Sequence, residues 1–340
     1  MTSASVASSA YAPTAARALS YFTERAEDAQ AAIMGILGGS GPGVAGPSGA
    51  ERYLAEVDLG SGEAENKLIR SKLESNSEYE RLEGLRTVVA MISRSLPAAD
   101  HLFPSVLKLT SVQSLQVKTL VYLVTLRLAP AHPDVALLSI NSFQRDLSDP
   151  SPLIRGMALR VLSGLGVKMA AAIMEMAIAK SARDTSAYTR RIAADAIGKC
   201  YELSRSRLPA LIPHLSTLLA DRHPSVLGSA VLALSCTAPD RDDLLHSNYR
   251  RICYALVDVD EWNQPVTLRV LLRYARRNLS RPSRSECERG VGFRSPAAAK
   301  WGAQLDCDLE LLLNKARPLL TSRNSAVSGW WGLPGCSRAL

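Results

Sequence analysis

Residues 221–234 of the chain read DRHPSVLGSAVLAL, and this phrase recurs along the sequence with regular spacing. Its first residue, Asp221, has counterparts at Asp149, Asp184 and Asp258, so successive copies begin 35, 37 and 37 residues apart. The copies at 149, 184 and 221 continue with a small residue or proline three places after the aspartate, and all four have a longer residue six places after it. A repeat of this length with two helical patterns is typical of a helical solenoid, in which neighbouring repeats bury one another's apolar faces.

The aspartate and the residue six places after it suggest two structural roles. A carboxylate just before a helix can accept orphan backbone N–H groups, so we expect each aspartate to act as an N-cap, with proline opening the helix. A cation at the sixth place can bridge to the aspartate of the next repeat, forming a HEAT-like ladder, or it can lie solvated on a helix face. The sixth place holds Lys118, Arg155, Arg190, Leu227 and Gln264, and the residues expected in a ladder are Asp149, Arg155, Asp184, Arg190, Asp221 and Asp258.

The pattern predicts an all-α protein, a HEAT/armadillo-like α-solenoid with a flexible N-terminus. With 47% apolar but only 5% aromatic residues, the core would consist of aliphatic side chains between helices, and no alternating strand pattern appears. The second helix of each pair follows the aspartate phrase. The first helices are expected at about 102–109, 134–147, 167–180, 208–220 and 244–257.

The net charge of +8 is concentrated in residues 269–294, which hold eight arginines and two glutamates. Such a charge is compatible with an acidic partner. No aromatic residues for base stacking alternate with these arginines, and no nucleic-acid-binding motif is present, so nucleic acid is not expected as a partner. We interpret this stretch as a solvated basic loop.

No catalytic or metal-binding motif appears in the sequence. There is no GxSxG elbow, HExxH helix or phosphate-binding loop, and the six cysteines lack metal-ligand spacing. We therefore expect no enzymatic activity, cofactor or metal, and we interpret the cysteines as reduced thiols of a cytoplasmic protein. Neither a secretory signal nor a membrane span is predicted, so any membrane contact would be peripheral.

Several long runs of sequence resemble a known family. The runs LFPSVL (102–107), PDVALLSINSF (133–143) and DPSPLIR (149–155) resemble the large β subunits of the heterotetrameric vesicle-coat adaptor complexes. Two later runs, CTAPDR (236–241) and LVDVDEW (256–262), resemble most the β subunit of the third adaptor type. A generic HEAT scaffold, such as a transport receptor or phosphatase scaffold, is the alternative interpretation, but it should lack these runs.

The resemblance implies a non-catalytic trunk subunit that assembles with a second large, a medium and a small subunit. Such a complex sorts cargo and acts in vesicle-mediated transport from the Golgi or endosomes to the lysosome or vacuole. The subunit would be cytoplasmic and peripheral on Golgi and endosomal membranes and coated vesicles. Recruitment in this family depends on an Arf-type small GTPase, and the positions matching its apolar contact are Leu137 and Ile140. The alternative is that both are core residues of an amphipathic helix.

The resemblance also predicts how the chain is divided. Beyond 327 the Gly- and Pro-containing sequence departs from the family, and we expect a truncation or altered reading frame there, so that most of the trunk and any hinge or appendage are missing. The expected segments are a flexible N-terminus with a Gly/Pro/Ser-rich linker (1–63), the adaptin-type solenoid (64–279), a basic insertion (280–304), a partial further repeat (305–327) and a divergent tail (328–340).

Overall fold

The computed structural model describes residues 63–94, 98–280, 306–322, 324 and 326–327, and these form helices and connections without a strand. Apart from Glu63 and Ser280, the predicted N-terminal segment (1–63) and basic insertion (280–304) lie outside the described residues, as does the predicted tail (328–340). The chain divides into two compact units, one ending at Val167 and the other beginning at Lys168.

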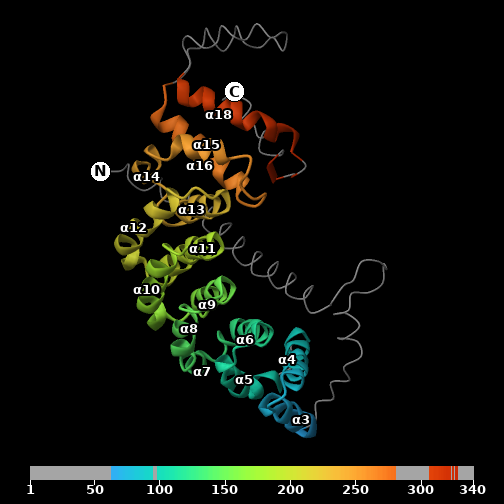
Figure 1. Cartoon of the computed structure of the whole chain (residues 1–340). Helices are drawn as coiled ribbons and strands as arrows, with labels where there is room; N and C mark the ends of the chain where they lie inside the picture. Colours follow the sequence, from blue (N-terminus) through green and yellow to red (C-terminus); the bar gives the residue numbers. More distant parts are fainter. Residues whose placement is uncertain (1–62, 95–97, 281–305, 323, 325, 328–340) are drawn as a thin grey trace, which may run out of the picture. The chain divides into compact units, whose positions relative to one another are not determined.

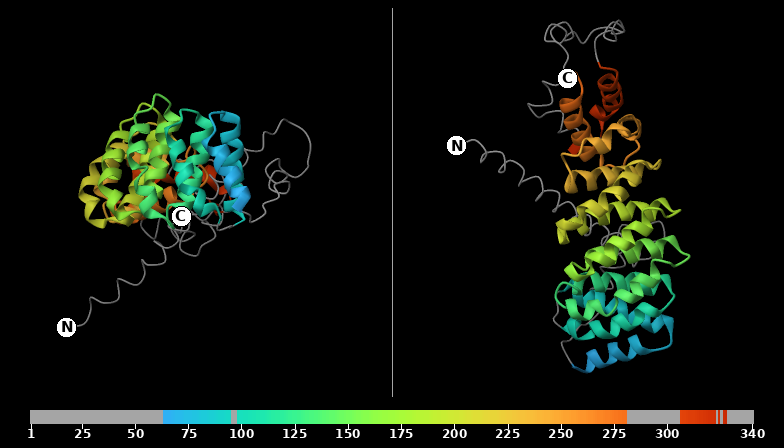
Figure 2. Two further views of the ribbon diagram at one scale, coloured as in Figure 1. Left: turned by 90° about the horizontal axis from the view of Figure 1, so that it is seen from below. Right: turned by 90° about the vertical axis from the view of Figure 1, so that its left-hand side faces the viewer.

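Unit 1 is a stack of helices in two rows (Figures 1 and 2). Its helices are α3 (Glu63–Glu74), α4 (Glu78–Ser93), α5 (Ala98–Lys108), α6 (Leu115–Leu128), α7 (Pro133–Leu137), α8 (Ile140–Asp146) and α9 (Pro152–Gly164), with a short 3-10 turn, η1, at Leu109–Ser111. In one row α4 packs on α6, and α6 packs on α9; α5 packs behind α4 and α6, and α8 packs behind α9. Aliphatic side chains that are fully buried between the rows, such as Leu85, Val121 and Leu159, form the core.

Unit 2 repeats this arrangement. Its helices are α10 (Ala171–Ser181), α11 (Ala187–Leu203), α12 (Leu208–Leu219), α13 (Pro224–Thr237), α14 (Asp243–His246), α15 (Tyr249–Ala255), α16 (Gln264–Asn278) and α18 (Cys307–Ala316), with 3-10 turns at Lys168–Ala170, Arg205–Arg207 and Arg317–Thr321. The row α11, α13 and α16 is continuous, and α18 packs against α15 and α16 (Figure 1). The prediction of an all-α solenoid is confirmed.

Two of the predicted first helices are each broken in two. The expected helix 134–147 is divided into α7 and α8, and the expected helix 244–257 into α14 and α15. Polar side chains lie at both breaks: the Ser139 hydroxyl donates to the Ala136 carbonyl at 2.7 Å, and Asn248 Nδ2 donates to the Leu244 carbonyl at 3.5 Å. Serine and asparagine compete in this way with the backbone hydrogen bonds of a helix, and this explains why a continuous helix is not formed.

Gly228 allows a close approach between two repeats of unit 2. A Cβ atom at this position of α13 would lie 2.7 Å from Val259 Cγ1 and 3.0 Å from Asn263 Cβ. Val259 and Asn263 are both buried in the segment that leads into α16, so neither side chain has room to move away. The residue without a side chain is therefore required for α13 to pack against this segment.

Candidate interaction surfaces

The repeated aspartate organises the turn before each second helix. In three copies its Oδ1 atom accepts the backbone N–H of the residue two places later, and that residue is the N-cap. The prediction that the aspartate itself is the N-cap is therefore wrong by two residues, because the carboxylate forms an Asx-type turn just outside the helix. The prolines at 152 and 224 open their helices as predicted. The three hydrogen bonds are Ser151 N to Asp149 at 2.8 Å, Ser186 N to Asp184 at 2.8 Å, and His223 N to Asp221 at 2.9 Å.

The arginine six places after the aspartate stabilises the same turn. Arg155 Nη1 donates to the carbonyls of Asp149 and Pro150 at 2.8 and 2.9 Å. Arg190 Nη1 donates in the same way to the carbonyls of Asp184 and Thr185, both at 2.9 Å. The spacing of the aspartate and the arginine is thus explained first by contacts within one repeat, which were not predicted from the sequence.

Arg190 also joins its repeat to the next one. Its Nε donates to Asp221 Oδ2 at 2.5 Å and its Nη2 to Asp221 Oδ1 at 3.2 Å, a two-pronged pair whose side chains are 20% and 10% exposed. Burial alone would raise the pKa of Asp221, but the hydrogen bonds from Arg190 and from the His223 N–H outweigh it and hold this pKa below its ordinary value. This pair has the geometry expected for a rung of the ladder.

Other rungs differ from the predicted pairs. Lys118 bonds to Asp146, three residues before the expected Asp149. Asp258 is exposed. The neighbouring Asp260 forms an ion pair instead, with 3.4 Å between its Oδ2 atom and Arg191 Nη2. For Asp258 the physical reason is local, because α16 begins six residues after this aspartate, whereas α9, α11 and α13 begin three residues after theirs.

A buried ionic cluster links α6 to α8 in unit 1. Lys118 Nζ lies 2.6 Å from Asp146 Oδ1, and the Tyr122 hydroxyl donates to Asp146 Oδ2 at 2.5 Å. The Lys118 side chain is fully buried and that of Asp146 is 3% exposed. Burial and the hydrogen bond to Asp146 raise the pKa of Tyr122 above its usual range, so its proton stays in the cluster. The cluster therefore fixes α8 and the turn that leads into it.

That turn carries the residues expected to contact a small GTPase. Ile140 is buried, with 6% exposure, and Leu137 is half-buried. Between them Leu138 is 80% exposed, the highest value among the exposed large apolar residues of the described part of the chain. The structure thus places Ile140 in the core and presents Leu138 at the surface. Sequence reasoning missed Leu138 because the break between α7 and α8, which turns its side chain outward, was not predicted.

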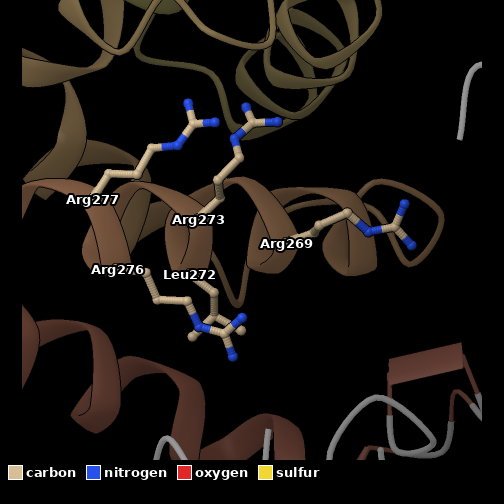
Figure 3. Close-up of a pocket in the computed structure, with 5 residues that line it drawn as sticks. All are labelled: Arg269, Leu272, Arg273, Arg276 and Arg277. Carbon is tan, nitrogen blue, oxygen red and sulfur yellow. The ribbon is translucent and has the colours of Figure 1, made fainter. Parts of the chain in front are cut away.

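The positive stretch 269–294 does not begin as a loop. Its first four arginines, Arg269, Arg273, Arg276 and Arg277, lie on α16 (Figure 3), so the interpretation of the whole stretch as a basic loop is wrong for this part. The remainder lies outside the described residues.

Among the described residues, no three or more His, Cys, Asp or Glu side chains gather where they could hold a metal ion. No described helix combines the length and apolar character that crossing a membrane requires.

The paired helices and the ladder contacts define this chain as an α-solenoid repeat protein. Residues 62–328 match the model of the adaptin N terminal region, and the chain belongs to this family. An engineered protein of known crystal structure shares the fold, with a TM-score of 0.50 and 15% identity over 92% of this chain and 75% of the other.

Among curated relatives, the AP-3 complex subunit beta-2 of Mus musculus is 40% identical over 280 residues, which cover 76% of this chain and 26% of the relative. The AP-3 complex subunit beta of Dictyostelium discoideum is 35% identical over 288 residues, with the same coverage. A homology model of the full-length AP-3 complex in an intermediate open conformation matches with a TM-score of 0.55 and 27% identity, over 82% of this chain and 46% of that chain. The resemblance to adaptor β subunits is confirmed, and the chain spans about a quarter of the length of these curated relatives.

Proposed function

We propose that the chain acts as a non-catalytic trunk segment of a vesicle-coat adaptor complex. The observation that carries this proposal is the family match over residues 62–328, supported by the likeness to the AP-3 complex over 82% of the chain. A solenoid presents long continuous surfaces instead of an enclosed site, as an assembly subunit requires. Its partners would be a second large, a medium and a small adaptor subunit, and its role would be cargo sorting from Golgi or endosomal membranes to the lysosome or vacuole.

Affinity purification of the tagged 340-residue chain from cells, followed by mass spectrometry, tests this proposal. We expect the other adaptor subunits to be recovered with the chain. The Asp146→Ala variant, which breaks the buried cluster in unit 1, serves as the control for nonspecific recovery. It should bring down fewer subunits than the natural chain.

We also infer that the turn between α7 and α8 contacts an Arf-type small GTPase, in line with recruitment to Golgi or endosomal membranes. Support comes from the family membership and from the exposure of Leu138 beside the two positions expected from the resemblance. An apolar side chain that is 80% exposed on a fixed turn is suited to bury its surface against a partner. Leu138 would then provide the apolar contact, while Ile140 holds the turn on the core.

Leu138→Asp is expected to weaken binding of the GTP-loaded GTPase about tenfold, because it places a charge in an apolar contact. Leu68→Asp on α3 is the matched control: Leu68 is also exposed, at 57%, and the same substitution there should leave binding unchanged. Biolayer interferometry with GTP- and GDP-loaded GTPase measures the affinity of each variant. Equal weakening by the two variants, or none by either, would show that the α7–α8 turn is not the contact.

A further inference from the structure

Two helices of unit 2, α10 and α12, present exposed surfaces with little charge. They contact each other and lie side by side in Figure 1. Met169 and Met176, which are 79% and 62% exposed, are the two most exposed large apolar residues of the described part of unit 2. α12 contains no lysine, arginine, aspartate or glutamate. The exposed residues that we call the methionine face are Met169, Ala172 and Met176 at α10, and Pro209, Ala210 and Pro213 on α12.

The core of unit 2 does not require this apolar surface. α10 buries Ala171, Met174 and Ile178, and a surface helix normally carries polar residues on its other side. A helix that is apolar on both sides is normally covered on both sides. The one carboxylate of α10, Glu175, forms an ion pair with Arg207 before α12, so its charge is balanced within the unit. The methionine face therefore has the composition of a helix surface that a partner covers.

Positive charge borders the methionine face at both ends. Lys168 and Arg205 precede α10 and α12, and Arg183 and Arg222 follow them. All four side chains are exposed, and none forms a hydrogen bond or ion pair with another residue in the part of the chain that the structure describes. Because consecutive helices of such a solenoid alternate in direction, α10 and α12 run the same way, and two cations lie at each end of the face.

The carboxylates near these ends do not offset the four cations. Asp184 and Asp221 are half-buried; Asp184 accepts the backbone N–H of Ser186, and Asp221 is paired with Arg190. Glu202, near the end of α11, is the only exposed carboxylate between residues 168 and 222, all of which the structure describes. The borders of the methionine face are therefore positive, and the four cations are available to an acidic partner.

We propose that the methionine face binds an amphipathic helix of a partner protein whose apolar stripe has acidic residues at both ends. Two helices packed about 8–10 Å apart leave a groove that accepts the apolar side of a third helix. Methionine side chains are flexible and polarizable, and they adapt to the side chains of a partner. The face between Lys168 and Arg183 is about 20 Å long, the length of a helix of about 14 residues. Acidic residues near both ends of such a helix would lie beside the bordering cations.

The same observations disfavour a second copy of this chain and a membrane. In a two-fold contact between copies, the bordering cations of one copy would come close to those of the other, and like charges repel. The face contains no tryptophan, tyrosine or phenylalanine, whereas helices that lie on a bilayer commonly insert such rings. A partner helix with its own acidic residues matches both the apolar and the charged parts of the surface. This inference does not depend on the role as an adaptor trunk.

Fluorescence anisotropy with the full 340-residue chain tests the proposal. The probe is a fluorescein-labelled peptide of about 18 residues, with leucines at helical spacing along one side, glutamates at both ends, and alanine and glutamine elsewhere. The control probe carries glutamine in place of every glutamate. We expect the acidic probe to bind the natural chain. The glutamine probe should bind about fivefold more weakly, because it lacks the contacts with the bordering cations.

Met169→Ser with Met176→Ser tests the apolar contact. We expect the affinity for the acidic probe to fall about tenfold, since two apolar side chains no longer bury surface against its leucines. Both methionines are exposed in the free chain, so the fold should not depend on them. The matched control is Leu68→Ser with Leu153→Ser, which replaces two exposed leucines of unit 1 and should lower the affinity less than about twofold.

Lys168→Glu with Arg183→Glu tests the bordering charges. This variant should lose about tenfold in affinity for the acidic probe but less than about twofold for the glutamine probe, because the reversed charges act on the glutamates. The matched control is Lys67→Glu with Arg127→Glu, which reverses one exposed lysine and one exposed arginine of unit 1 and changes the net charge equally. Its loss should stay below about threefold.

Absence of probe binding, or equal losses in the test and control variants, would overturn the proposal. Binding of phosphatidylserine vesicles that depends on Met169 and Met176, without binding of the probe, would also overturn it, since this would assign the face to a membrane. Self-association in analytical ultracentrifugation that the serine variant abolishes would assign the face to a second copy instead.

Discussion

Asp146→Ala is expected to destabilise unit 1 by about 4 kcal/mol, the largest effect predicted here, because it leaves the ammonium group of Lys118 buried without its carboxylate. The Tyr122 hydroxyl would lose its acceptor in the same step. The T-shaped contact of Tyr122 with Phe143, at a centroid distance of 5.5 Å, would then no longer be supported by a hydrogen bond to α8. Hydrogen-exchange mass spectrometry of peptides from α6 and α8 measures the loss of stability in unit 1 alone.

A variant that replaces the whole cluster separates the cost of an unpaired charge from the value of the pair. Lys118→Met, Tyr122→Phe and Asp146→Leu together remove every polar atom of the cluster, and we expect stability within about 1 kcal/mol of the natural chain. A single Asp146→Ala variant with exchange protection equal to that of the natural chain would show that the cluster does not hold α8 in place.

Arg190→Met is expected to destabilise unit 2 by about 2 kcal/mol. The substitution retains the apolar stem but removes two hydrogen bonds to Asp221 and two to backbone carbonyls. Arg191→Met is the matched control, because Arg191 makes one longer contact, 3.4 Å to Asp260, and should lose less than about 1 kcal/mol. Urea unfolding, followed by hydrogen exchange at α11 and α13, compares the stability losses of the two variants. Equal losses would mean that the two-pronged geometry has no special value.

The same pair predicts how stability depends on pH. Because the pKa of Asp221 is held below its ordinary value of 3.8, the folded state binds a proton at this carboxyl less readily than the unfolded chain. The stabilisation of the folded state by the Arg190–Asp221 pair is therefore complete above about pH 5, and it is lost as the pH falls through the lowered pKa of Asp221. Asp221→Asn should be less stable than the natural chain at pH 7, and the difference should shrink toward pH 3. A difference that is constant with pH would contradict this assignment.

The period of the aspartate phrase was enough to predict the helical repeats, because the helix starts at Pro152 and Pro224 depend on local residues that are visible in the sequence. The partner of Lys118 was not predictable, since Asp146 lies outside the repeated register and the contact depends on how α8 packs. The break at Ser139 depends on one side-chain hydrogen bond, which competes with a strong helical pattern. The arginines of α16 were interpreted as a loop because of their charge, although their spacing is helical.

For the candidate surface at α7–α8, the family resemblance singled out Leu137 and Ile140, whereas the exposed residue is Leu138. Apolar periodicity cannot distinguish Leu137, Leu138 and Ile140 unless the ends of the two short helices are known. The outward position of Leu138 follows from the break, and the buried position of Ile140 follows from the start of α8.

The most direct test of the central claim, that this chain is a trunk segment of an adaptor complex, is mass spectrometry of what the tagged 340-residue chain retains from cells. We expect recovery of a second large, a medium and a small adaptor subunit in comparable amounts, and lower recovery when Asp146→Ala breaks the cluster in unit 1. A folded, soluble chain that retains none of these subunits would contradict the claim.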